Sequence, residues 1–198
     1  MLLCRLFEVK GTGQLATSDR FERCRPRYAA GAHEPVVRRV AGWFAVTLFR
    51  YAVAFQMTQR EIPCLFMRGG TSRGPFFDLE DLPTGPAVRD RVLQAAMGSP
   101  DARQVDGLGG ATSLTSKVAI VGRSDRPDVD VDYLFAQVSI DKPIVDTAPS
   151  CGNMLAGVGP YAIETGMVAA ADPVTRVMIY NVNTNAVIEA IVQTPDGQ

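Results

Sequence analysis

Short apolar runs separated by glycine- and proline-containing turns dominate the chain from residue 57 onward. Their lengths and their β-branched and aromatic residues are typical of strands. In residues 136–140 apolar and polar positions alternate, which predicts a half-buried strand. The predicted strands are 62–67, 76–77, 118–121, 133–140, 174–180 and 186–192.

A helical pattern first interrupts these runs between Pro86 and Gly98. Proline suits the first position of a helix, and glycine suits its end. The apolar residues between them fall on one face of a helix with 3.6 residues per turn. These residues are Val88, Val92, Leu93, Ala96 and Met97. The pattern predicts a helix over 86–97 that buries one face.

A second helical segment, 154–168, is apolar or small nearly all round and contains a single charged residue. This composition predicts a helix that is buried on every side. Gly157 and Gly159 would allow strands to pack closely against it, and Gly166 is a natural C-cap. Pro160 marks either a kink or the start of the regular part of the helix. Helices and strands together predict a mixed α and β domain.

Three segments rich in glycine and hydroxyl side chains border these elements. Residues 67–74 follow a predicted strand, 106–117 precede one, and 151–160 open the apolar helix. Backbone N–H groups in such turns can approach an anion closely. Cys151 lies at the first turn of the helix, at the positive end of the helix dipole. This last segment therefore combines a group able to transfer protons with a site for a carboxylate.

Taken together, the three segments resemble the PrpF-like isomerases, a family of the diaminopimelate-epimerase-like superfamily. The resemblance extends from about Met57 to the last residue, and segment 97–117 leans toward the 4-oxalomesaconate tautomerase branch. It implies an α+β fold in which a mixed β-sheet wraps around a central apolar helix. Family members have two similar domains with the catalytic cleft between them. We therefore expect 57–198 to be only the N-terminal domain, truncated at its C-terminus.

The chemistry that the resemblance implies is a 1,3-proton shift, a keto–enol tautomerisation, on a small unsaturated polycarboxylate, most like 4-oxalomesaconate. Such a reaction needs no metal and no other cofactor, but it needs a general base, a general acid and stabilisation of an enolate-like state. The family's catalytic lysine and cysteine correspond to Lys117 and Cys151. Two alternatives are a 2-methylaconitate cis–trans isomerase and a non-catalytic single lobe that only binds carboxylates.

The substrate of such an enzyme carries several carboxylates, so cations and N–H or O–H donors are expected around it. The predicted substrate-binding residues are Arg68, Thr71, Ser72, Arg73, Gly109, Gly110, Ser116, Gly152 and Asn153. Many relatives have lysine where this chain has Arg73. Arginine binds carboxylates but effectively cannot deprotonate, so Arg73 is expected to bind the substrate and not to transfer a proton.

Composition narrows the remaining classes of function. The formal net charge of −1 gives no reason to expect nucleic acid or an anionic membrane as a partner. Four cysteines without CxxC spacing and the single histidine, His33, do not suit a metal site. Reduced thiols favour a cytoplasmic protein. The predicted partner is therefore a small polycarboxylate, and a homodimer is the one assembly that we consider.

Residues 1–56 differ from the rest, because they contain nine Lys and Arg against four Asp and Glu and show little periodicity. The apolar stretch 40–55 is interrupted by Arg50, which does not suit a transmembrane helix. We predict that 1–56 is a basic extension. It is either a disordered or targeting segment, or upstream DNA read in frame before a true start at Met57, and we favour the second interpretation.

Overall fold

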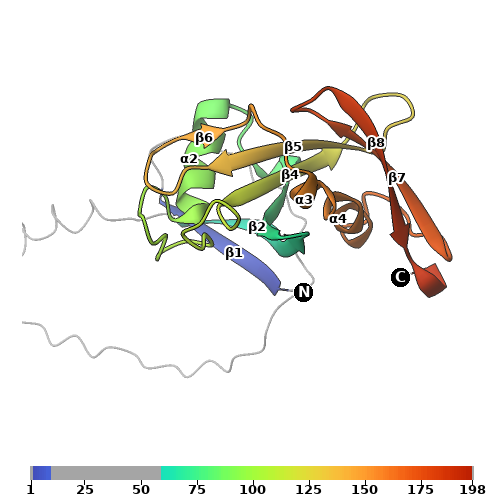
Figure 1. Cartoon of the computed structure of the whole chain (residues 1–198), viewed down its shortest axis with the longest axis horizontal. Coiled ribbons are helices and arrows are strands. Elements are labelled where there is room, and N and C mark those ends of the chain that lie inside the picture. Colours follow the sequence, from blue (N-terminus) through green and yellow to red (C-terminus); the bar gives the residue numbers. More distant parts are fainter. Residues whose placement is uncertain (1, 10–58, 198) are drawn as a thin grey trace, which may run out of the picture. The chain divides into compact units, whose positions relative to one another are not determined.

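The computed structural model describes residues 2–9 and 59–197, with side chains over 61–197. Figure 1 shows the arrangement of the helices and strands. The strands are β1 (Leu2–Val9), β2 (Gln59–Gly69), β3 (Ser72–Asp78), β4 (Lys117–Arg123), β5 (Val131–Val138), β6 (Val145–Asp146), β7 (Val174–Asn181) and β8 (Ala186–Gln193). The helices are α2 (Pro86–Met97), α3 (Gly152–Leu155) and α4 (Val158–Glu164), with 3-10 turns η1 (Leu79–Asp81) and η2 (Pro195–Gly197).

The described strands form one mixed sheet in the order β1-β2-β3-β4-β5-β7-β8, with β6 paired to β5. The pairs β2–β3, β4–β5 and β7–β8 are antiparallel, whereas β3–β4 and β5–β7 are parallel. Each parallel pair requires a crossover that passes over one face of the sheet. Helix α2 lies in the first crossover, and α3 and α4 lie in the second.

The two crossovers cover opposite faces of the sheet, as Figure 1 shows. Both proceed in the same direction across the sheet, but β3 and β4 run opposite to β5 and β7. Two crossovers of the same hand must then place their helices on opposite faces. The strand order therefore explains why this sheet is covered on both sides.

Side chains alternate between two apolar clusters, one on each face of the sheet. On β3, Phe76 packs with α3 and α4, whereas Phe77 packs with α2. On β5, Phe135 and Ala136 divide in the same way, so this strand is buried on both faces. The alternation predicted over 136–140 is confirmed over 136–138, where Ala136 and Val138 are buried toward α2 and Gln137 is partly exposed, but the strand ends at Val138.

Most predicted elements are confirmed, with small shifts of their ends. The pattern missed β1 and β6, and it placed Val88 on the buried face of α2, where the structure leaves that residue 41% exposed. Gly98 ends α2 in the left-handed conformation, as expected. Of the predicted extension 1–56, residues 10–56 lie outside the described residues, so its interpretation stays a prediction.

The predicted central helix is broken into two. Helix α3 ends at Leu155 and α4 begins at Val158, so Pro160 lies in the first turn of α4 and neither breaks nor kinks it. Gly166 follows α4 in the left-handed conformation, which confirms its role near the C-cap. The expectation of burial on every side is wrong, because Ala156 and Glu164 are exposed.

At the break, Gly157 and Gly159 each lie against a side chain, and the two side chains differ in how easily they can shift. A Cβ on Gly157 would lie 2.7 Å from Cζ of the fully buried Phe76, whereas one on Gly159 would lie 2.9 Å from Cγ2 of Val192, which is only half-buried on the edge strand β8. Gly157→Ala is therefore expected to lower the free energy of unfolding by about 1–3 kcal/mol. In Gly159→Ala, a shift of Val192 and a gain of about 1 kcal/mol in helix propensity should leave stability nearly unchanged.

Urea denaturation of both variants measures this difference directly. Equal losses of stability in Gly157→Ala and Gly159→Ala would contradict the packing described for the break, since only Phe76 is unable to move.

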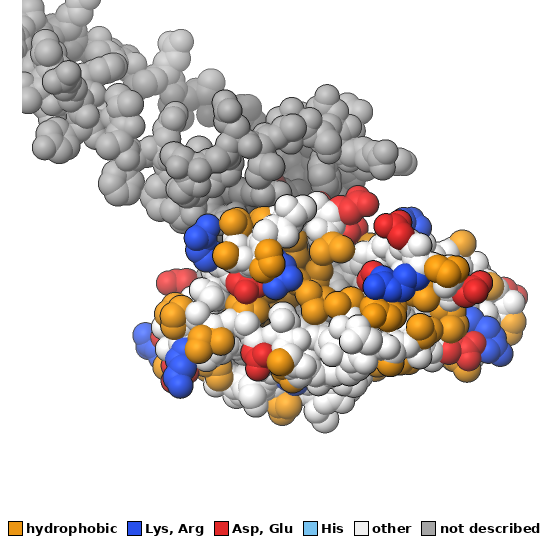
Figure 2. All heavy atoms as spheres, turned by 90° about the horizontal axis from the view of Figure 1, so that it is seen from above, with side chains coloured by type: hydrophobic (Ala, Val, Ile, Leu, Met, Phe, Trp, Pro, Cys, Tyr) orange, Lys and Arg blue, Asp and Glu red, His pale blue; other side chains and the backbone are white. Residues whose placement is uncertain are grey.

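The face seen in Figure 2 carries hydrophobic side chains among Lys, Arg, Asp and Glu, and charges of both signs are interspersed. Among the described residues the most exposed large apolar side chains include Val105, Val187 and Ile191. Within the described part of the chain, the helices are too short or too polar to cross a membrane.

Candidate active site

Lys117 and Cys151 meet on the face of the sheet covered by α3. Lys117 is the first residue of β4, and Cys151 is the residue immediately before α3. The Nζ atom of Lys117 donates a hydrogen bond to the Sγ atom of Cys151 over 3.2 Å. The same nitrogen lies 5.3 Å from the centre of the Phe135 ring, within the range of a cation–π contact. Cys151 is 8% exposed, so the pair lies at the edge of the apolar cluster.

Tyr133 holds the backbone of Cys151 through a hydrogen bond. Its hydroxyl donates to the Cys151 carbonyl over 3.3 Å, and that carbonyl also accepts from Leu155 N in the first turn of α3. Burial raises the pKa of the Tyr133 phenol, and the nearby Cys151 raises it further. The phenol therefore remains a neutral donor at physiological pH.

Asn153 connects α3 to the turn between β2 and β3. Its Nδ2 atom donates to Thr71 Oγ1 over 2.8 Å and lies 3.5 Å from Ser72 Oγ. The turn approaches the helix so closely that a Cβ on Gly69 would lie 2.0 Å from the Asn153 carbonyl oxygen. Gly70 adopts a left-handed φ of 52°. The first glycine-rich segment thus lies against the third.

Arg73 connects this turn to the second glycine-rich segment. Its backbone N–H donates to the Leu114 carbonyl over 3.1 Å, and its Nη2 atom would lie 3.2 Å from a Cβ on Gly110. Arg68 is paired with Arg73 across β2 and β3, and both side chains are exposed. The guanidinium group of Arg73 therefore borders the loop that contains Gly109 and Gly110.

Two predicted binding residues have contrasting surroundings. Ser116 is fully buried: its hydroxyl donates to the Val138 carbonyl over 2.8 Å and accepts from Gln104 Nε2 over 2.7 Å. The structure thus assigns Ser116 contacts within the protein, and its contact with substrate stays a prediction. Gly152 is exposed beside a groove of about 520 Å³ that α3, α4 and β8 line. No neighbour among the described residues lies within 4 Å of a Cβ built on Gly152.

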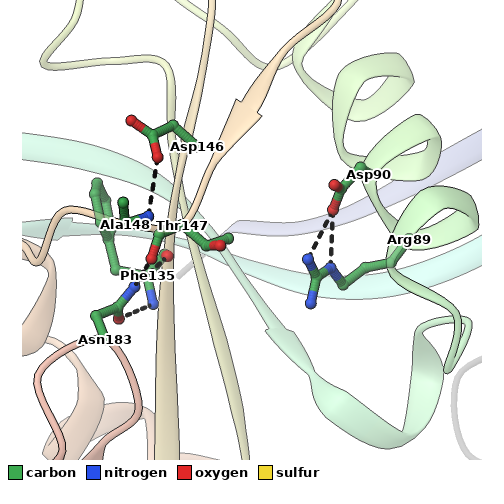
Figure 3. A network of polar contacts seen from close by, with 7 residues as sticks. All are labelled: Arg89, Asp90, Phe135, Asp146, Thr147, Ala148 and Asn183. Atoms are coloured by element: carbon green, nitrogen blue, oxygen red, sulfur yellow. Dashed lines mark hydrogen bonds and ion pairs between the residues drawn. The ribbon is translucent and has the colours of Figure 1, made fainter.

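The segment that leads to Cys151 is held by Asn183, from the turn between β7 and β8. Figure 3 shows this side chain between Phe135 and Thr147. Its Nδ2 atom donates to both of their carbonyls, and its Oδ1 atom accepts from Phe135 N. Asp146 accepts from Ala148 N one residue further on. The same view contains the separate Arg89–Asp90 pair on α2.

Sequence reasoning missed three residues that shape this site: Gln104, Tyr133 and Asn183. Each is polar and lies in or next to an apolar element or a turn, where a pattern of hydrophobicity assigns it no partner. The asparagine-rich turn 181–185 was a usable signal, because asparagine side chains commonly bond to backbone groups in turns.

The arrangement places two proton-transfer groups 3.2 Å apart, immediately before α3. The cysteine thiol and lysine amine can each exchange a proton with a bound carbon acid. The exposed Thr71 hydroxyl, which accepts from Asn153, and the exposed guanidinium groups of Arg68 and Arg73 are able to bind carboxylates. Such a set suits proton transfer on an anionic substrate.

Comparison with known proteins gives a consistent result. Residues 59–198 match the family described as PrpF protein. The chain is 60% identical to a 4-oxalomesaconate tautomerase of Pseudomonas putida strain KT2440, over 72% of this chain and 39% of that protein. It is 53% identical to a 3-methylitaconate isomerase of Eubacterium barkeri, over 71% of this chain and 37% of that protein.

A solved structure described as methylitaconate-delta-isomerase superposes with a TM-score of 0.67 at 53% identity, covering 69% of this chain and 35% of that one. The chain thus spans about two fifths of the length of the curated relatives that it matches. The family match covers well over half of the chain, and the resemblance noted in the three glycine-rich segments is confirmed. The chain belongs to the PrpF family.

Proposed function

We propose that this chain forms one lobe of an isomerase that catalyses a 1,3-proton shift on a small unsaturated polycarboxylate, most like 4-oxalomesaconate. The observation that carries the proposal is the contact between Lys117 Nζ and Cys151 Sγ at 3.2 Å. Relatives named as isomerases of oxalomesaconate and methylitaconate support the same class of reaction.

In this mechanism the substrate binds with a carboxylate against Arg73 and the turn that contains Thr71. Lys117, in its neutral form, accepts a proton from the carbon next to a carbonyl or double bond. The negative charge spreads over the conjugated system, where backbone N–H groups of the glycine-rich loops stabilise it. A proton returns two carbons away, and Cys151 is the second group through which protons move. No metal and no other cofactor takes part in these steps.

The finer assignment of the fold belongs to the same proposal. We place the sheet with α3 and α4 in the diaminopimelate-epimerase-like superfamily, as the N-terminal domain of two, in a cytoplasmic enzyme. A cleft between two such domains would enclose the exposed side of the Lys117–Cys151 pair.

The share of the relatives that the chain spans favours one second candidate. A chain that corresponds to about two fifths of the related proteins could bind carboxylates without turning them over. This candidate retains the loops, Arg73 and Asn153 as a binding surface and assigns no proton transfer to Lys117.

Proton exchange distinguishes the two candidates. The 198-residue protein is incubated with 4-oxalomesaconate in deuterated water, and deuterium in the substrate is followed by NMR. We expect incorporation faster than the rate without protein, and equally fast with Lys142→Ala, which removes an exposed lysine between β5 and β6. Binding measured by calorimetry without exchange would contradict the isomerase and support the second candidate. Parallel incubation with 2-methylaconitate tests the choice of substrate.

A further inference from the structure

Gln104 is a buried amide in the crossover between α2 and β4, and every polar atom of its side chain is used. The residue is 1% exposed. Its Nε2 atom donates to Ser99 Oγ over 3.1 Å and to Ser116 Oγ over 2.7 Å, and its Oε1 atom accepts from Ala111 N over 2.9 Å. One side chain therefore connects the end of α2 with both ends of the loop 111–116.

This loop adjoins the residues assigned to the reaction. Gly109 and Gly110 precede it, and a Cβ on Gly109 would lie 2.2 Å from Gln104 Oε1, so no larger residue fits there. Lys117 follows the loop directly. Ser116 and Lys117 project to opposite faces of the sheet, the first toward Gln104 and Val138, the second toward Cys151. Gln104 thus holds the start of β4 from the face opposite to the reacting groups.

The backbone at both ends of the Gln104–Ala111 contact is in an unusual conformation. Gln104 has a φ of 49° and Ala111 a φ of 56°, a left-handed region that residues other than glycine seldom occupy. Such conformations cost about 1–3 kcal/mol each and persist only where the surroundings enforce them. The hydrogen bond from Ala111 N to Gln104 Oε1 joins these two residues directly.

We propose that Gln104 is a positioning residue for proton transfer: through Ser116 and Ala111 it fixes Lys117 against Cys151 and orients the N–H groups of the loop toward the substrate carboxylate. The inference rests on the proposed function for its effect on turnover. Its structural part, the placement of Lys117 against Cys151, does not depend on turnover and has its own measurement.

Two substitutions separate the contacts. Gln104→Met keeps the length of the side chain and removes all three of its hydrogen bonds, whereas Ser116→Ala removes one of the three together with the bond from Ser116 to the Val138 carbonyl. Gln94→Met, at a half-buried position on α2, is the matched control. We expect kcat to fall by about 10- to 100-fold in Gln104→Met with KM changed less than threefold, because small displacements of a catalytic group have such effects. In the variant that combines Gln104→Met with Ser116→Ala, the fold-loss in kcat should be smaller than the product of the two single fold-losses.

The second measurement is the rate of alkylation of Cys151 by iodoacetamide, followed by peptide mass spectrometry with buried Cys64 as internal reference. Lys117→Ala defines the rate without the lysine contact. We expect Gln104→Met to move the rate at least halfway to that value on a logarithmic scale, and Gln94→Met to leave it unchanged. The proposal is overturned if Cys151 is alkylated at the wild-type rate in a folded Gln104→Met protein. It is also overturned if the fall in kcat is no larger than the fall in the fraction of folded protein. If the unsubstituted protein incorporates no deuterium into the substrate, the proposed function fails. The alkylation rates then still decide whether Gln104 positions Lys117 against Cys151.

Discussion

Lys117→Ala is expected to reduce the rate of proton exchange by at least about 10³-fold, because removal of a general base typically costs 10²–10⁴-fold and no other described amine touches Cys151. The side chain is half-buried at the start of β4, so its loss should change stability little. The measurement is deuterium incorporation into 4-oxalomesaconate at saturating substrate, with folding checked by circular dichroism.

Two companion variants test the assignment of the base. Lys117→Arg keeps the positive charge but effectively cannot deprotonate, so it should be as inactive as the alanine variant. Cys151→Ala should also lose activity, by about 10²-fold or more, if the thiol moves a proton. Lys142→Ala is the control for loss of a lysine. Activity within tenfold of the wild type in Lys117→Ala would show that another group is the base.

Gly74→Ala is the substitution expected to damage the fold most. A Cβ at this position would lie 1.9 Å from the carbonyl oxygen of Lys117. This oxygen belongs to the backbone of the neighbouring strand β4, so it cannot move aside as the end of a side chain could. Strands β3 and β4 would have to separate two residues before their first parallel pair, Phe76 and Ala119. We expect the free energy of unfolding to fall by about 3 kcal/mol or more, the upper end for overpacking, measured by urea denaturation.

Gly85→Ala provides the comparison. Gly85 caps α2, and a Cβ there would lie 4.0 Å from Val88 Cγ2, an ordinary contact distance. Its effect should stay below about 1 kcal/mol, since only the capping preference changes. A Gly74→Ala protein as stable as Gly85→Ala would mean that β3 and β4 are not packed as described.

The strands were predictable because short apolar runs bounded by turns have few other interpretations. The pattern failed where tertiary contacts decide. Pro160 indicated a kink or a later start of the regular helix in the apolar segment 154–168, but it did not place the break at 156–157, where Gly157 contacts Phe76. Burial of β5 on both faces depends on the position of α2, and a single strand's sequence does not contain that information.

In the candidate site, too, some residues could be predicted from the sequence and others depend on tertiary contacts. Glycine-rich turns beside strands predicted where anions would bind, and the family resemblance picked out Lys117 and Cys151. Their contact joins residues 34 positions apart and depends on the register of β4 with β5. Neither Gln104 nor Tyr133 was predictable, because a lone polar residue in an apolar context has many possible partners until the fold is known.

The opposite orientations of Ser116 and Lys117 restrict how the length of the chain can change. Side chains alternate along a strand, so a shift of one residue at the start of β4 would turn Lys117 toward α2 and bring Ser116 to the thiol. Surface loops usually accept insertions and deletions readily. The segment between Gln104 and Lys117 is an exception, although much of it is exposed: a gained or lost residue that was absorbed at the start of β4 would exchange the buried hydroxyl and the reacting amine.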